Sequence, residues 1–172
     1  MRKDAGLTLP ELLMVVALAA LLLVATAAYS VPWLARESMR SAAYDVQRSI
    51  QTARIQAVSR NHECRFVINT ANRLVRVVDT MGTAALADDQ ILDEVELPDT
   101  ISFARPDIGL PVTLTPLGGA WFGARFNSEG TVTQGWGEIV MFGGNQFGRI
   151  SLFAAGGVQA DRWNGSSWLR GL

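Results

Sequence analysis

Residues 6–29 read GLTLPELLMVVALAALLLVATAAY, and this stretch decides the fold. From Leu12 to Tyr29 it runs for 18 residues without a charged side chain. At about 1.5 Å per residue, a helix of that length just reaches the lower limit for crossing the hydrocarbon layer of a bilayer. The stretch therefore predicts an N-terminal helix whose first half spans a membrane.

The composition of the whole chain agrees with this interpretation. The chain has 172 residues, of which 49% are hydrophobic, and its mean hydropathy of +0.19 is high for a soluble protein of this size. Its length suits one ordinary domain in addition to the membrane segment. The net charge is −1, so no basic field points to nucleic acid.

A short polar leader, Met1–Gly6, precedes the apolar run and carries two basic residues. Basic residues at this end predict a cytoplasmic N-terminus and an exported C-terminal domain. A cleavable secretory signal would share the basic start, and the Ala-Thr-Ala at residues 25–27 resembles its cleavage site, but the apolar run exceeds the usual length of about 7–15 residues. A plain signal anchor would account for the span but not for Gly6 or Glu11. A buried helix of a soluble protein is the remaining alternative.

Glu11 is the most informative residue, because it places a carboxylate at the edge of an apolar helix. Such a group costs roughly 2–3 kcal/mol or more in a membrane unless it is paired, and it is by default a hint of function. If the chain were cut after Gly6, Leu7 would carry a new α-amine one helical turn from Glu11. The carboxylate could then meet an amine, its own or a neighbour's, inside a packed bundle. Pro10 fits only near a helix start, where its missing N–H costs nothing, and Thr8 suits the N-cap.

These residues resemble the type IV prepilin family, whose signature is a short basic leader, a cleaved Gly, usually Phe, then Thr-Leu-x-Glu-Leu and an apolar helix. Residues 6–12 read GLTLPEL, with Leu7 in place of Phe and, farther on, Ala28 in place of the helix proline common in major pilins. The resemblance implies cleavage after Gly6 by an inner-membrane prepilin peptidase and N-methylation of Leu7. It also implies that Glu11 neutralises the terminal amine of an adjacent subunit during assembly on an inner-membrane platform.

Beyond Pro32 an apolar stripe continues at intervals of three and four residues, which is typical of one helix face. The stripe consists of Ala35, Met39, Ala43, Val46, Ile50, Ala53 and Ala57. Arginines off the stripe, such as Arg48, are expected to form a solvated face. A proline can kink a helix without ending it, so one long helix is predicted, apolar all round at first and amphipathic later. Its second half should pack on a sheet.

From Cys64 onward the apolar period changes to two residues, which is typical of strands. Strands are expected at residues 64–68, 74–78, 91–97, 101–104, 119–126, 138–142, 149–154 and 158–163. A helix followed by strands predicts the α+β class with an antiparallel sheet. The expected organisation is a leader peptide (1–6), a transmembrane helix (7–31), an amphipathic helix (32–61) and an antiparallel β domain (62–172).

The part of the chain that follows the membrane segment looks like the GspH/FimT subgroup of pilin-like proteins. The matching pieces are the helix end at residues 53–60 running into a hairpin, Ile101-Ser102-Phe103, the RFNSEG at residues 125–130 and the final strand pair around residues 156–157. The resemblance implies a pilin fold and a minor pilin or pseudopilin, which helps to start assembly or contacts cargo. Its machine would be a type IV pilus or a type II secretion apparatus, and its partners other pilin or pseudopilin subunits. It would be a single-pass protein of a bacterial inner membrane with its C-terminal domain in the periplasm or outside.

A DNA-binding minor pilin of an uptake system is the alternative function. The FimT branch that binds DNA resembles this body but carries Gly-Arg-x-Arg, where this chain has GRIS at residues 148–151. The C-terminal part offers aromatic and basic residues that could contact nucleic acid or a partner, or simply cover the end of the domain. These residues are Arg149, Arg162, Trp163, Trp168 and Arg170. The acidic balance argues against phosphate binding, so nucleic acid is not the expected partner.

Neither catalysis nor a metal or cofactor is predicted, because no G-x-S-x-G, Walker loop or CxxC occurs. Cys64 is the only cysteine, so no intramolecular disulfide can form, and it is expected to be a small buried apolar residue. His62 is the only histidine, expected at the surface or as a helix cap, which leaves no material for a histidine-based metal site. An acidic stretch lacks the ligand spacing and turn glycine of a calcium loop and is expected to be a solvated loop and strand edge. Its residues are Asp88, Asp89, Asp93, Glu94, Glu96 and Asp99.

Overall fold

The computed structural model describes residues 9–82 and 89–171, and of residues 27–32 and 35 it describes the backbone alone. Within these residues one helix is followed by ten strands. The chain divides into two compact units, residues 1–34 and residues 35–172. The helix α1 (Leu9–Arg60) contributes to both. Because its backbone stays helical through position 32, the prediction of one long helix is confirmed.

The first unit is the apolar part of α1. The segment Leu9–Thr26 has a mean hydropathy of 2.4 and exposes its side chains along its whole length. By length and composition it is the one helix in the described part of the chain that could cross a membrane. Pro10 is the second residue of α1, where a helix needs no N–H. The predicted N-cap, Thr8, lies outside the described residues.

In the second unit, one face of α1 is buried. The buried residues of the predicted stripe are Met39, Ala43, Val46, Ile50, Ala53 and Ala57, each at most 2% exposed. Ala42 and Ser49 are buried beside them, so the buried face is wider than the stripe. Arg36, Arg40 and Arg48 are exposed, as a solvated face requires.

The strands form two antiparallel sheets, whereas the sequence predicted one. The first sheet has the order β3-β2-β1-β5-β4, with β6 also paired to β5. Its strands are β1 (Cys64–Asn69), β2 (Leu74–Asp79), β3 (Gln90–Glu96), β4 (Thr115–Gly118), β5 (Trp121–Phe126) and β6 (Val132–Gln134). The second sheet has the order β10-β9-β8-β7. Its strands are β7 (Gly137–Gly143), β8 (Gln146–Leu152), β9 (Val158–Trp163) and β10 (Trp168–Arg170).

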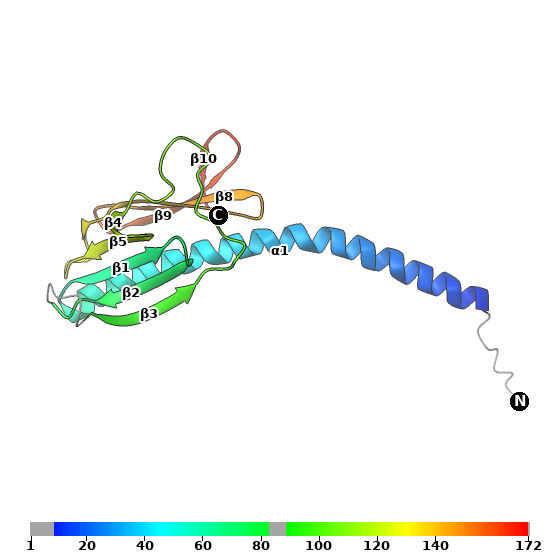
Figure 1. The fold of residues 1–172 in the computed structure, drawn as a ribbon, viewed down its shortest axis with the longest axis horizontal. Helices are drawn as coiled ribbons and strands as arrows, with labels where there is room; N and C mark the ends of the chain where they lie inside the picture. The colour runs from blue at the N-terminus through cyan, green and yellow to red at the C-terminus, as the bar shows by residue number, and fades with distance from the viewer. Residues whose placement is uncertain (1–8, 83–88, 172) are drawn as a thin grey trace, which may run out of the picture. The chain divides into compact units, whose positions relative to one another are not determined.

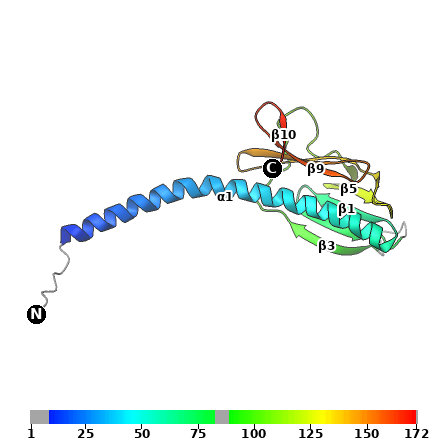
Figure 2. The ribbon, with the colours of Figure 1, turned by 180° about the vertical axis from the view of Figure 1, so that it is seen from behind.

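Both sheets share one hydrophobic core with α1. The core cluster takes Val46 and Ile50 from the helix, Phe66 from β1, and Met141 and Ile150 from the second sheet. Figure 1 shows both sheets alongside the C-terminal half of α1, and Figure 2 shows the same packing from behind. The fold is therefore α+β, a helix packed on antiparallel sheets, as predicted.

One predicted strand is wrong. Residues 101–104 do not form a strand, and Ser102 alone makes an isolated bridge, to Phe142 of β7. The amide of Ile101 instead donates to the carbonyl of Pro98 at 2.9 Å. Because this N–H closes a turn, the segment does not extend into a ladder, although Ile101 is buried.

Three strands were not predicted, and they share a weak sequence signal. β4 contains Pro116 and ends at Gly118, and β6 and β10 have three residues each. A run of three residues is too short to show a period of two. The turn that joins β4 to β5 uses Gly118 and Gly119, which have φ of 112° and 59°. The predicted strand at 119–126 therefore begins two residues later, at Trp121.

Candidate functional site

The first candidate site is the start of α1. The predicted processing residues, Gly6 and Leu7, lie outside the described part of the chain. Glu11 is in the first turn of α1, where a carboxylate interacts favourably with the helix dipole. It is the only charged residue of the segment Leu9–Thr26.

The surface around Glu11 is made of exposed apolar side chains. Leu12, Leu13 and Met14 are each more than half exposed, and the same holds for most of the segment. A continuous apolar surface of this size is not stable in water, and it marks a surface that lipid or another helix covers. Once it is covered, Glu11 is the one group in the segment that can pair with a cation, and an unpaired carboxylate there is costly.

The second candidate site is the predicted aromatic and basic set at the C-terminus. The hairpin of β9 and β10 places Trp163 opposite Trp168, and their rings meet edge to face with centroids 5.2 Å apart. The guanidinium of Arg149, on β8, lies 4.7 Å from the centre of the Trp168 ring. The structure therefore brings three of the predicted residues together.

Arg149 is held by carboxylates on both sides. Its Nη2 lies 2.7 Å from Oδ2 of Asp161, the residue opposite it on β9, and its Nη1 lies 3.1 Å from Oε1 of Glu138 on β7. Asp161 is 1% exposed. Removing Arg149 would leave a buried carboxylate without its main partner, which is a strongly destabilising change.

A second arginine closes this network into a ring of contacts. Arg105 bonds Glu138 at 2.9 Å and Asp107 at 2.6 Å, and Asp107 accepts the indole N–H of Trp168 at 3.3 Å. The hydrogen bond from Arg105, against a smaller opposing effect of desolvation, holds the pKa of Asp107 below its ordinary value. The ring sets two arginines against three carboxylates, so its formal charge is −1.

The remaining arginines of the set do not extend this network into a basic patch. Arg149, Asp161 and Arg170 are partners in one cross-strand row, whereas Arg162 is paired with Gly148 in the next row. Successive residues of a strand point to opposite faces of a sheet. Arg162 therefore faces away from Arg149, whereas Arg170 shares the face of Arg149 with the acidic Asp161 between them, and both Arg162 and Arg170 are exposed.

Three carboxylates of the acidic stretch pair with arginines of β1, of β2 and of the turn between these two strands. β3 is the edge strand of the first sheet, and Asp88 lies outside the described residues. The ion pairs are Asp89 to Arg65 at 3.4 Å, Glu94 to Arg76 at 2.5 Å and Asp99 to Arg73 at 2.6 Å. These carboxylates have cationic partners within the chain, and nothing in their arrangement gathers them around a common point.

A third cluster, at the junction of α1 and β1, was not predicted. The carboxyl of Asp79 is fully buried and lies 2.5 Å from both Nη1 of Arg60 and Nε2 of His62. Burial alone would raise the pKa of Asp79, but hydrogen bonds from His62 and the Met81 amide, and the charge of Arg60, hold that pKa below its ordinary value. Cys64 is fully buried beside this pair, as predicted.

The sequence held a signal for this cluster. The turn at residues 69–73 starts a hairpin in which Asn69 faces Leu74. Counting outward from that pair in a regular antiparallel ladder places Cys64 opposite Asp79, the pairing that the structure has. His62 was assigned to the surface or a cap because its partner is 17 residues away along the chain.

Comparison with known proteins finds similarity at two levels. Residues 1–27 match the prokaryotic N-terminal methylation motif. Among solved structures, the chain resembles the minor pseudopilin EpsH from the type 2 secretion system of Vibrio cholerae, at 15% sequence identity and a TM-score of 0.49, over 72% of this chain and 95% of that one. Comparison with curated protein sequences gives no match.

Proposed function

We propose that this chain, which carries a prokaryotic N-terminal methylation motif, is a structural subunit of a type IV pilus or of a type II secretion pseudopilus. The observation that carries the proposal is the match of residues 1–27 to that motif, directly ahead of and within an apolar helix that exposes its side chains. The role is structural and not enzymatic.

The proposed subunit is processed and then assembled through α1. A prepilin peptidase removes residues 1–6, and the new N-terminus at Leu7 is methylated. The helix anchors the subunit in the inner membrane with residues 35–172 on the outer side, which agrees with the basic leader. Assembly on an inner-membrane platform then exchanges lipid around α1 for the helices of other subunits, and Glu11 pairs with the terminal amine of a neighbour.

Processing gives the first prediction. Protein isolated from its native host should begin at Leu7 and carry a methylated amine. Removal of residues 1–6 takes away two basic residues and one acidic residue, so the net charge should change from −1 to −2. Intact-mass analysis with N-terminal sequencing checks both. Gly6→Leu should leave the leader attached, while the neighbouring Ala5→Leu serves as the matched control and should still be cleaved. An N-terminus near Ala28 would instead identify a secretory signal.

The charge of the chain does not favour the DNA-uptake alternative. Arg149, the one arginine of the GRIS segment, is engaged by Asp161 and Glu138, and the network that includes it has a formal charge of −1. From residue 32 onward the chain holds 13 basic residues (15 minus Arg2 and Lys3) against 14 acidic residues (16 minus Asp4 and Glu11). Affinity for duplex DNA grows with the number of phosphates that Lys and Arg neutralise. Neither the charge of the network around Arg149 nor the net charge of residues 32–172 therefore favours DNA binding.

The second prediction is that the full-length chain in detergent binds duplex DNA only weakly and without sequence preference. Fluorescence anisotropy at about 150 mM salt checks this, because non-specific electrostatic binding is already weakened there. Arg162→Ala removes an exposed arginine of the tail, and Arg48→Ala removes an exposed arginine of α1 as the control. Low-micromolar binding that Arg162→Ala abolishes and Arg48→Ala preserves would favour DNA uptake over the structural role.

A further inference from the structure

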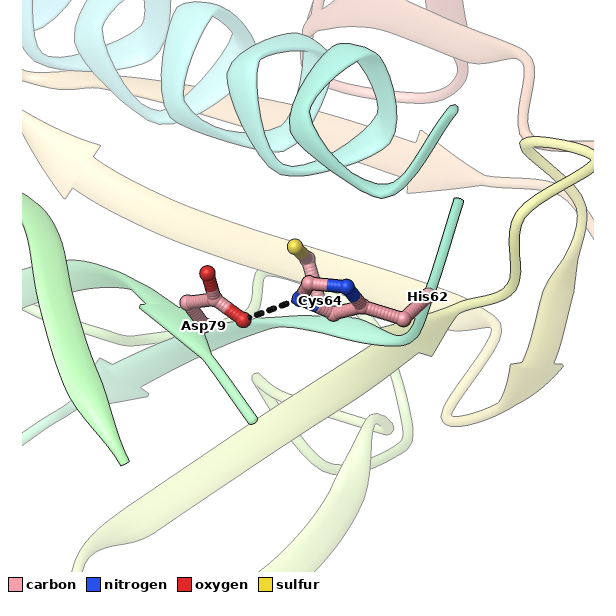
Figure 3. Close-up of side chains that lie close together, drawn as sticks. All are labelled: His62, Cys64 and Asp79. Atoms are coloured by element: carbon pink, nitrogen blue, oxygen red, sulfur yellow. Dashed lines mark hydrogen bonds and ion pairs between the residues drawn. The ribbon is translucent and has the colours of Figure 1, made fainter. Parts of the chain in front are cut away.

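Three side chains that can bind a metal converge where α1 meets the first sheet. A ring nitrogen of His62, Sγ of Cys64 and a carboxylate oxygen of Asp79 all lie within 4.8 Å of one another. Figure 3 shows the three side chains close together, with the contact between His62 and Asp79 dashed. No other group of at least three His, Cys, Asp or Glu residues in the described part of the chain has this spacing.

The backbone fixes two of the three ligands. Cys64 and Asp79 are direct partners in the ladder between β1 and β2, and residues opposite each other in a ladder place their side chains on the same face. Both are fully buried. His62 follows Asn61, whose φ of 56° ends the helix and turns the chain toward β1, and its side chain is 29% exposed. Two ligands are therefore rigidly placed, and the third is free to adjust.

Each ring nitrogen of His62 faces an oxygen atom. Its Nδ1 lies 3.1 Å from the carbonyl oxygen of Arg60, and its Nε2 lies 2.5 Å from Oδ1 of Asp79. A neutral imidazole has a single N–H, so it can donate to one of these oxygens while its lone pair faces the other. A metal ion bound to Nε2 resolves this conflict. Donation of Nδ1–H to a backbone carbonyl is the contact that orients histidine ligands in metal sites.

The carboxylate of Asp79 is oriented in the same way. Its Oδ2 accepts from Arg60 at 2.5 Å, and its Oδ1 accepts from the amide of Met81 at 2.8 Å. Each carboxylate oxygen has two lone pairs. One lone pair of Oδ1 accepts from the Met81 amide, and the other can face Nε2 of His62 or a metal ion. The arginine and the amide hold the group in place without using this lone pair.

Cys64 supplies the soft ligand. Burial, followed by the nearby charge of Asp79, raises the pKa of its thiol to about 11. A bound divalent ion displaces the proton and is bound by the thiolate. The proton leaves to solvent, and the site gains one sulfur–metal bond.

We propose that His62, Cys64 and Asp79 form a binding site for a borderline-soft divalent cation, with Zn²⁺ as the preferred ion and water as the fourth ligand. One nitrogen, one sulfur and one oxygen suit tetrahedral zinc, whereas calcium and magnesium require oxygen ligands. Ligands of a tetrahedral zinc site are about 3.3–3.8 Å apart, given bonds of roughly 2.0–2.3 Å. Because Nε2 of His62 lies 2.5 Å from Oδ1 of Asp79, binding requires the partly exposed His62 ring to move away from the carboxylate by about 1 Å.

The site would connect three segments of the fold. It lies at the end of α1, the first residue of β1 and the last residue of β2, and a metal ion there would hold these chain segments together. A ligand that binds only the folded state stabilises it by an amount that grows with the logarithm of the ligand concentration once that concentration exceeds the dissociation constant. The inference does not depend on the assembly function, since the cluster lies within residues 60–81.

The test uses the full-length, untagged chain in detergent. One equivalent of Zn²⁺ should bind in competition with a chromophoric chelator and raise the midpoint of thermal unfolding. Co²⁺ in its place should give a thiolate-to-cobalt charge-transfer band, which can come from Cys64 alone because the chain has one cysteine. His62→Gln and Cys64→Ala should each weaken binding by at least about tenfold, as the loss of a contact to a metal site does.

Controls separate this site from other binding. Glu129→Gln changes an exposed carboxylate and should bind zinc like the parent chain. Near-ultraviolet circular dichroism shows whether each variant is folded. If Cys64→Ala does not fold, His62→Gln still tests the site, because His62 is partly exposed and its substitution disturbs the core less. The proposal is overturned if no cobalt band appears, or if zinc binds the parent and His62→Gln equally.

Discussion

Glu11→Gln should remove most of the subunit from assembled filaments while its amount in the membrane stays the same or rises. The substitution keeps the size of the side chain and removes its charge. Membrane insertion should not suffer, because a costly carboxylate has been taken out of an apolar helix. In a packed bundle, however, the amine of a neighbour loses its partner, and breaking a buried pair in this way costs about 3–5 kcal/mol. A loss of that size lowers incorporation by more than about tenfold.

The measurement compares sheared filaments with the membrane fraction by immunoblot. Glu37→Gln is the matched control, since Glu37 is an exposed glutamate of the same helix beyond the apolar segment, and its variant should assemble normally. Equal incorporation of the parent and Glu11→Gln would rule out the proposed role of this carboxylate. It would leave the processing of the leader untouched, because that prediction depends on Gly6.

Ile50→Ala should lower the free energy of unfolding of the domain by about 2–5 kcal/mol. Ile50 is completely buried in the core cluster that joins α1 to both sheets. The substitution loses the transfer free energy of the removed carbons and leaves a cavity that the two sheets cannot close completely. The loss is large because a domain of this kind has a total stability of only about 5–15 kcal/mol.

The helix offers a matched control for this prediction. Ile55 lies five residues farther along α1 and is 61% exposed, so Ile55→Ala should change the free energy of unfolding by no more than about 0.5 kcal/mol. Urea unfolding in detergent, followed by the fluorescence of the tryptophans, compares the two variants with the parent. Similar losses from both would mean that the buried face of α1 has been assigned incorrectly.

The parts of the fold that repeat a period were predictable from the sequence. Ile50 and Ala53 follow the helical period and are buried, and β1 and β2 follow the period of two around a polar turn. The split into two sheets was not predictable, because an alternating pattern shows that a strand has an inner face but not which strand lies beside it. β10 was missed because the pairing of Trp168 with Trp163 depends on a contact between two strands and leaves no period in the sequence.

The candidate sites divide along a similar line. Glu11 could be identified from the sequence, because a charged residue within an apolar run is evident without knowledge of the fold. The partners of Arg149 could not be identified from the sequence, since Glu138 and Asp161 are 11 and 12 residues away on separate strands. The cluster at Asp79 was missed for another reason. A single histidine excludes a histidine-rich metal site. It does not exclude a site in which one histidine, one cysteine and one carboxylate come together.

The charges of β3 also bear on aggregation. An edge strand presents unpaired N–H and C=O groups that can pair with the edge of another molecule, and charged side chains are a common protection against this. β3 is an edge strand of seven residues, and three of them, Asp93, Glu94 and Glu96, are acidic. Two copies that joined along this strand would bring like charges face to face, which opposes the pairing. The acidic edge therefore opposes edge-to-edge pairing between copies of the domain.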